Sequence, residues 1–201
     1  GTLGGRPGDL FGPAPNLVEL RPARPALLRI RERIEQLPAS ARHVLMAAAV
    51  LGDRFRLDDL TELTRRPALD VLEALASFDN RVTGIEGGIG RFRHRSYRQA
   101  TLKATPEGTL RILHRDAAWG KEDRGAAALE VGMHLSRAGE DAACLDPLIR
   151  GLETLVNANV RHSTVRVAER IRAHLNHLPR TERRNRQRLR WLLLTGRAHL
   201  Q

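Results

Sequence analysis

The sequence has few aromatic residues, one cysteine and two lysines among 201 residues. The single cysteine, Cys144, cannot form an internal disulfide framework, so a reducing compartment such as the cytoplasm is expected. No apolar run approaches the ~20 residues of a membrane-spanning helix. The N-terminus also lacks the charged-then-apolar order of a signal peptide. We therefore expect a cytoplasmic chain without a membrane partner.

Because aromatic residues make up only 3% of the chain, leucine, alanine, valine and isoleucine must form most of its core. Aliphatic side chains that recur every three to four residues are typical of amphipathic helices. The length allows one or two domains, each with a core of its own. The composition therefore predicts a mainly α fold.

Basic residues outnumber acidic ones by 34 to 23, which gives a formal net charge of +11. Nearly all are arginines, since only Lys103 and Lys121 are lysines. Such an excess is compatible with an acidic partner, for example nucleic acid. We favour a biased codon usage as its origin, because arginine, alanine, glycine and leucine are all frequent and charge alone is a weak guide to function.

Residues 91–119 form the most informative stretch, because the period of the sequence changes within it. Phe92 and His94 alternate with arginines over the first five residues, which is the period of a strand with one wet face. Ser96 can then cap a helix, and Pro106 can begin another. His94 is therefore expected where a strand ends and a helix begins.

Residues 1–22 are rich in glycine and proline and show no period, so a linker is expected there. Residues 23–104 follow the order helix, helix, helix, two-stranded hairpin, which is typical of a winged-helix domain. The two strands of the wing are expected at 81–86 and 91–95, joined by the glycine-rich turn 87–90.

Residues 105–201 consist of amphipathic helices with short polar joints, and one of them is expected at 123–138. Their spacing is near the ~34 residues of a tetratricopeptide (TPR) repeat, which predicts a TPR-like α-solenoid of antiparallel helix pairs. The last helix carries Leu189, Leu192 and Leu193 to the end of the chain without a polar cap. We therefore expect a truncated array.

Residues for catalysis are scarce. The glycines of 84–90 are followed by neither the lysine nor the helix of a phosphate-binding loop. His174 and His177 have no third zinc ligand, and Cys144 is interpreted as a small buried residue rather than a nucleophile. We therefore predict no catalytic site, no metal site and no cofactor held by this chain alone.

Direct binding of DNA or RNA is an alternative function. The helix that would enter the major groove presents Asp70 and Glu73, which repel phosphates. Basic residues lie instead on the expected wing and on the last helix, where a solvated helix face is the commoner interpretation. The candidate phosphate contacts, all arginines, are Arg91, Arg93, Arg95, Arg183, Arg184, Arg186, Arg188 and Arg190.

Four segments together resemble one family: RIEQLPASARHVLMAAAVLGDRFRLDDLTEL, RFRHRSYRQATL, LHRDAAW and HLSRAGEDAA. They are similar to the region after the nucleotide-binding domain in signal-transduction ATPases with numerous domains, the AAA+-related STAND class. The resemblance is closest to large ATP-binding regulators of the LuxR type, and it covers residues 20–201. In that class a winged-helix domain follows the ATPase and leads into a TPR-like sensor array.

The resemblance implies a role for His94. In the STAND class a Met-His-Asp type motif begins the helix after the wing, and its histidine contacts the β-phosphate of bound ADP. The motif falls here on Arg93, His94 and Arg95, so the histidine matches and its neighbours do not. His94 is therefore the expected contact to ATP or ADP, held by a nucleotide-binding domain in cis. The Walker motifs would lie upstream of this chain.

The expected function is that of a non-catalytic regulatory segment in a bacterial transcriptional regulator. The winged helix would dock on the nucleotide-binding domain, and the helical repeats would sense a small-molecule inducer or a partner protein. DNA would be bound by a separate domain. Switching would be a population shift between closed and open arrangements. A TPR-like scaffold that binds peptides on its concave face is a third alternative.

Overall fold

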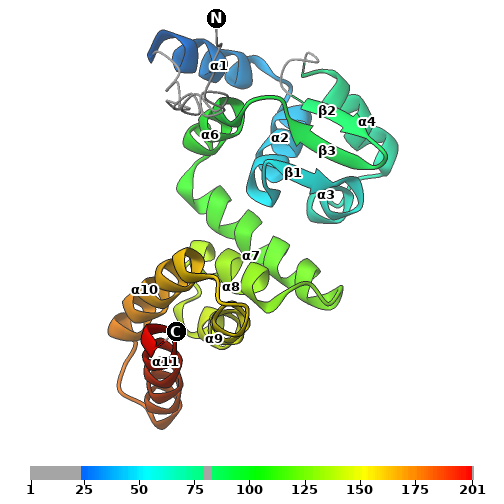
Figure 1. Cartoon of the computed structure of the whole chain (residues 1–201). Helices are drawn as coiled ribbons and strands as arrows, with labels where there is room; N and C mark the ends of the chain where they lie inside the picture. The colour runs from blue at the N-terminus through cyan, green and yellow to red at the C-terminus, as the bar shows by residue number, and fades with distance from the viewer. Residues whose placement is uncertain (1–23, 79–82, 201) are drawn as a thin grey trace, which may run out of the picture.

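The chain folds into two bodies joined end to end (Figure 1). The structure, a computed structural model, describes residues 24–78 and 83–200, and the predicted linker 1–22 lies outside them. Within these residues, ten helices and a three-stranded antiparallel sheet confirm the mainly α fold. The first body comprises α1 (Arg24–Gln36), α2 (Ala39–Leu51), β1 (Arg54–Arg56), α3 (Leu57–Thr64), α4 (Ala68–Ala76), β2 (Thr83–Glu86), β3 (Ile89–Phe92) and α6 (Arg95–Ala104). The second comprises α7 (Glu107–Asp123), α8 (Ala128–Ala138), α9 (Asp141–Asn157), α10 (Arg161–His177) and α11 (Glu182–Leu200).

Helix α2 is the centre of the first body, because it is apolar on nearly every side. Val44, Leu45 and Val50 are at most 1% exposed, and α3, α4 and α6 pack around them. Pro38, whose ring cannot continue α1, marks the start of α2. Gly52 ends the helix with a φ of 144°, a conformation that favours glycine. A helix-breaking residue therefore marks each boundary of α2.

The sheet has the order β1-β3-β2, so β3 is its central strand. Gly90 of β3 pairs with Phe55 of β1 and with Ile85 of β2. A Cβ atom at Gly90 would lie 2.1 Å from the buried Phe55 ring, so glycine is needed where the ring crosses the strand. Gly87 and Gly88 join β2 to β3 with φ values of 57° and 75°, as a type I′ hairpin turn requires.

The structure corrects the predicted hairpin in two respects. Strand β1 adds a third strand that the sequence did not predict, because only Phe55 of its three residues faces the core. Strand β3 spans Ile89–Phe92 rather than 91–95, and His94 in place of Ser96 is the N-cap residue of α6. The alternation after Phe92 therefore belongs to the turn into the helix.

One helix boundary in the second body also differs from the prediction. The helix expected at 123–138 begins later, at Ala128, because α7 continues to Asp123. Its N-cap residue, Ala127, has no side chain that could cap the helix, so the sequence carries no signal at this boundary. Farther along the chain, Pro147 lies inside α9.

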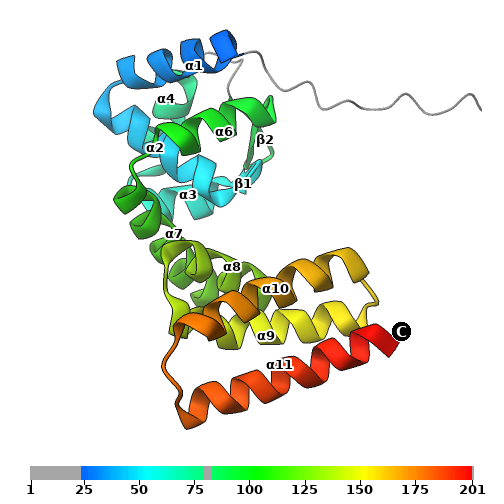
Figure 2. The ribbon, with the colours of Figure 1, turned by 90° about the vertical axis from the view of Figure 1, so that its left-hand side faces the viewer.

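Among residues 24–78 and 83–200, two hydrophobic clusters form the core, and α7 contributes to both. Leu113 and Ala117 belong to the first cluster, whereas Ala118 belongs to the second. The division predicted at residue 104 coincides with the end of α6, yet the first core extends past it into α7. In Figure 2, α7 lies between the two bodies and enters both.

Glycines allow α8 and α9 to pack closely. A Cβ atom at Gly132 would lie 2.8 Å from the backbone nitrogen of Leu148, and one at Gly151 would lie 2.7 Å from the Cβ of Leu129. The two helices therefore approach to a distance that larger residues would prevent. Farther along the chain, α9, α10 and α11 lie side by side with alternating direction (Figure 2).

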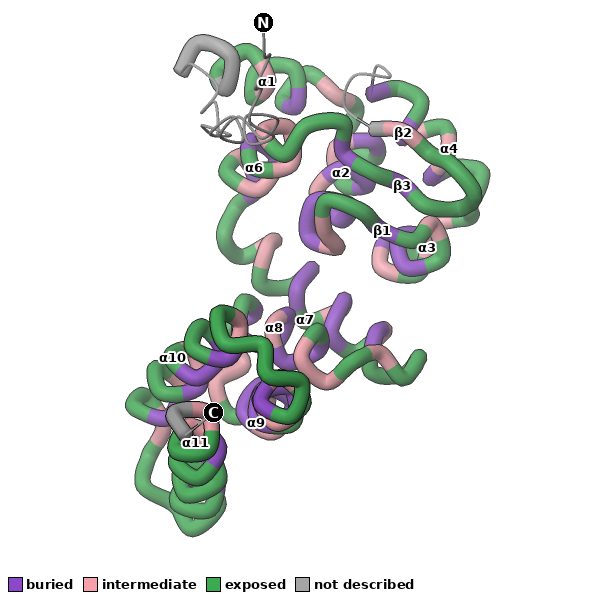
Figure 3. Tube along the Cα trace, in the orientation of Figure 1, coloured by how far each residue is buried: buried purple, intermediate pink, exposed green. Residues whose placement is uncertain are grey.

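Helix α11 is apolar on its inner side and also on part of its outer side. Leu194 and Trp191 pack into the second cluster, beside the buried Arg184 and Gln187, whereas Leu189 and Leu193 are 60% and 62% exposed. Figure 3 shows α11 exposed along most of its length. The predicted leucine face therefore exists but points away from the rest of the body. Among the described helices, none combines the length and apolarity needed to cross a bilayer.

Candidate functional site

His94 lies at the N-terminus of α6, directly after the sheet (Figure 1). It has the extended conformation of an N-cap residue, φ −137° and ψ 138°, and its own side chain makes no capping hydrogen bond to the helix. The residue is exposed, and its ring centroid lies 5.9 Å from that of Tyr97. Free backbone N–H groups and the helix dipole make such a terminus attractive to anions. A phosphate placed there would meet both an imidazole and backbone donors.

The arginines predicted around His94 lie at the same end of the sheet. Arg91 and Arg93 are exposed, and both side chains come within 4.0 Å of the position that a Cβ of Gly84 would occupy. They therefore extend over β2. Arg95, the first residue of α6, is exposed as well. The structure thus places Arg91 and Arg93 side by side over β2, and His94 and Arg95 follow them at the start of α6.

The second predicted set of arginines lies on α11, at the far end of the molecule (Figure 1). The prediction of a phosphate contact was wrong for Arg184, because its side chain is buried. Helix α11 packs it against α10, where its Nε donates to the carbonyl oxygen of Leu175 at 2.7 Å. Arg188 is exposed. The others form ion pairs, Arg183 with Asp146 at 2.7 Å, Arg190 with Glu153 at 2.5 Å and Arg186 with Glu182 at 3.9 Å. Most of this set is therefore engaged within the chain.

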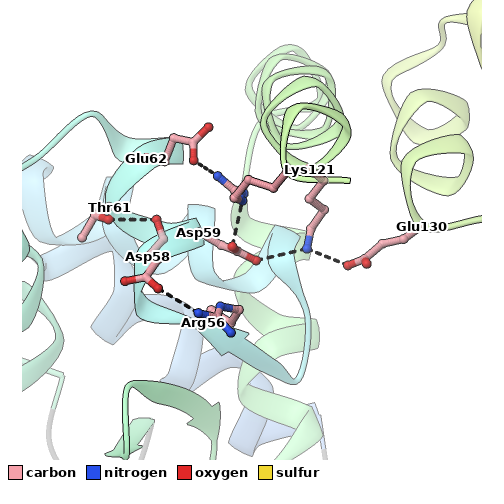
Figure 4. A network of polar contacts seen from close by, with 8 residues as sticks. Arg56, Asp58, Asp59, Thr61, Glu62, Lys121 and Glu130 are labelled. Atoms are coloured by element: carbon pink, nitrogen blue, oxygen red, sulfur yellow. Dashed lines mark hydrogen bonds and ion pairs between the residues drawn. The ribbon is translucent and has the colours of Figure 1, made fainter. Parts of the chain in front are cut away.

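A buried ion-pair network joins the two bodies (Figure 4). Lys121 of α7 lies between Asp59 of α3 at 3.2 Å and Glu130 of α8 at 2.6 Å, and the side chains of Lys121 and Asp59 are each 10% exposed. Arg124 pairs with Asp59 at 3.1 Å and also with Glu62. Burial opposes the charge of Lys121, but hydrogen bonds and attraction from Glu130 and Asp59 raise its pKa above the ordinary value. The ammonium group therefore stays charged and fixes three helices at the junction.

A buried histidine pair links α7 to α8. The Nδ1 atoms of His114 and His134 lie 3.0 Å apart, so one ring donates and the other accepts. Burial lowers the pKa of His114 to about 3, assisted by His134 and nearby arginines. Burial and nearby positive charges lower the pKa of His134 to about 4. Both rings are therefore neutral at pH 7.

A serine–histidine–aspartate relay links α8, α9 and α10. His174 donates from Nδ1 to Asp141 at 2.6 Å, and its Nε2 accepts from the Ser136 hydroxyl at 2.7 Å, a tautomer assigned from the two partners. This is the order of a hydrolytic triad. Ser136, however, is buried, and its oxygen already accepts from Nη1 of Arg170 at 3.0 Å. The relay therefore acts as a connection between helices.

The same relay accounts for His174, one of the two histidines that the sequence places three residues apart. It is engaged with Asp141 and Ser136, whereas His177 is exposed. Cys144 is fully buried, and burial raises the pKa of its thiol to about 12, so it packs as a neutral residue. The prediction of a small buried cysteine is confirmed.

Comparison of the chain with protein-family models, with curated proteins and with solved structures finds no match in any of the three.

Proposed function

We propose that this chain is a non-catalytic regulatory segment of a STAND-class signal-transduction ATPase. The observation that carries the proposal is His94, exposed at the N-terminus of α6. In the proposed docked state His94 donates to the β-phosphate of ADP, and the first backbone N–H groups of α6 face the same charge. The resemblance of the surrounding sequence to the STAND class supports this role.

The first body is interpreted as a winged-helix domain that docks on a nucleotide-binding domain. The hairpin of β2 and β3 serves as the wing, and α4 stands where a recognition helix would be. Asp70 and Glu73 on α4 are exposed, which disfavours contact with a nucleic-acid backbone. The burial of Arg184 and the ion pairs of its neighbours further weaken the alternative of direct DNA or RNA binding. Protein docking therefore fits this body better.

The helical body is interpreted as a TPR-like array that receives a partner protein. Leu189, Leu192 and Leu193 form an exposed stripe on α11, and Arg186 and Arg188 are exposed beside it. The fitting partner is an amphipathic helix whose apolar side covers the leucines and whose acidic residues meet the arginines. Self-association through this face is disfavoured, since it would bring arginines against arginines.

The test is the release of ADP from the whole protein, in which the proposal requires a nucleotide-binding domain. His94→Ala removes one charge-assisted hydrogen bond to phosphate, so ADP should leave about 10- to 100-fold faster, as measured with a fluorescent ADP analogue. His43→Ala, which changes another exposed histidine, is the matched control and should release ADP at the wild-type rate. Equal release rates from all three proteins would refute the role of His94.

A further inference from the structure

A group of arginines on α8 and α10 has little compensating negative charge. Arg137 of α8 and Arg166 of α10 are both exposed, and neither forms a side-chain hydrogen bond or an ion pair with any described residue. Arg170 of α10 donates Nη1 to Ser136 at 3.0 Å and keeps its other donors. The arginines of α11 differ, because three of the six pair with carboxylates.

Two of these arginines line one hollow between the two helices. Arg166 and Arg170 line this hollow of about 210 Å³ together with Met133 of α8. Arg137 follows Met133 by one helical turn, so it lies on the same side of α8. The hydrogen bond from Arg170 to Ser136 holds the helices together at this point. Two positive charges therefore line the hollow, and the charge of Arg137 on the facing helix is close enough to act on both of them.

The charges of these residues act on one another. Although Arg137 is exposed, desolvation by the surrounding chain is the largest cause that lowers its pKa, followed by the charges of Arg170, Arg98 and Arg166. The contribution of Arg98 shows that α6 adds positive charge from the first body. The hydrogen bonds from Arg170 through Ser136 and His174 lead to Asp141, but this carboxylate contacts His174 rather than an arginine. The electrostatic balance of this region favours a bound anion.

We propose that Arg137, Arg166 and Arg170 bind the phosphate group of a small phosphorylated molecule. Guanidinium groups match phosphate oxygens with two parallel hydrogen bonds each, and three of them suit a dianion better than a single carboxylate. Leu129 and Val167 line the same hollow as Arg166 and Arg170, and this apolar part of the wall contacts the apolar part of the ligand. This site is separate from His94 and does not depend on the proposed function.

The experiment uses the whole chain with phenyl phosphate as the probe and inorganic phosphate for comparison. Isothermal titration calorimetry at constant ionic strength should show saturable binding, with phenyl phosphate bound more tightly because its ring enters the hollow. Arg137→Gln/Arg166→Gln should weaken binding about tenfold or more, since charge-assisted hydrogen bonds are lost. Arg172→Gln/Arg188→Gln removes the same charge from exposed positions elsewhere and should leave the affinity within about twofold of wild type.

Three results would overturn the proposal. The first is non-saturable binding of phenyl phosphate, and the second is an equal loss of affinity in the site variant and the control variant. The third is that phenyl phosphate does not bind, whereas an oligonucleotide binds and loses affinity when these arginines are replaced. The melting temperature in chloride reports whether each variant folds. If Arg137→Gln/Arg166→Gln does not fold, Arg137→Lys/Arg166→Lys replaces it. Lysine keeps the charge but loses the planar fork, so phenyl phosphate should bind about threefold more weakly, and unchanged affinity would count against the site.

Discussion

Replacing Lys121 by methionine should weaken the junction between the two bodies. Methionine keeps an apolar stem in the buried position but removes the ammonium group from between Asp59 and Glu130. Breaking a buried ion pair costs about 3–5 kcal/mol when a charge is left without a partner. Asp59 keeps Arg124 at 3.1 Å, and the side chain of Glu130 is 45% exposed and can be solvated. We therefore expect a loss of about 2–3 kcal/mol in the free energy of unfolding.

Thermal unfolding followed by circular dichroism measures this loss. A decrease of about 2–3 kcal/mol corresponds to a melting temperature lower by roughly 4–12 °C in a chain of this size. The matched control is Arg111→Met, which breaks an exposed pair with Glu107 on the same helix and should cost less than about 1 kcal/mol. If Lys121→Met is no less stable than this control, the network does not hold the junction.

The pH dependence of the same comparison has a defined sign. The pKa of Lys121 is raised in the folded chain, so its contribution is present below the ordinary lysine pKa of about 10.4. The difference between wild type and Lys121→Met should persist from neutral pH to about pH 10 and disappear only at more alkaline pH. In addition, Asp59→Asn combined with Lys121→Met should cost about 1 kcal/mol less than the sum of the two single changes.

The buried histidine pair and the packing of α8 give further expectations. Because the pKa values of His114 and His134 are about 3 and about 4 against 6.5 for the free side chain, stability should fall as the pH decreases from about 6.5 towards 4. His114→Gln/His134→Gln should flatten this fall in melting temperature, and equal slopes would contradict the assignment. Gly132→Ala should cost about 1–3 kcal/mol in urea unfolding, since its Cβ would lie 2.8 Å from the backbone nitrogen of Leu148. Gly196→Ala, with no atom within 4 Å, should instead stabilise the chain by up to about 1 kcal/mol, and the reverse order would contradict the packing described.

The features that the sequence predicted correctly depend on local chemistry. The predicted end of a helix at residue 138 is confirmed for α8, because Gly139 follows it with a φ of 81°. The hairpin turn at Gly87 and Gly88 likewise requires positive φ values. Strand β1 was missed because three residues are too few to establish a period. The leucine face of α11 was predicted, but periodicity does not reveal which side of a helix packs inward.

The polar connections could not be predicted, because their members are far apart in the sequence. Lys121 and Asp59 are separated by 62 positions, and His174 and Ser136 by 38. A carboxylate on one helix surface resembles any other until the chain is folded. The one sequence signal for these connections was Lys121, because it is one of only two lysines in a chain whose other basic residues are arginines. The placement of His94 between strand and helix was local and was therefore predictable.

The position of α7 in both cores affects how the chain can be divided. A polypeptide that ends at Ala104 would lack Leu113 and Ala117, so the apolar surface of α2 and α3 that α7 covers would be exposed to water. The complementary polypeptide, beginning at Thr105, would carry those two side chains uncovered on a folded helix. Each half would be prone to aggregate alone, and the two halves should restore one another when refolded together. Limited proteolysis should accordingly release no stable first body. Cleavage near residue 104 would separate this body from α7, which both clusters need.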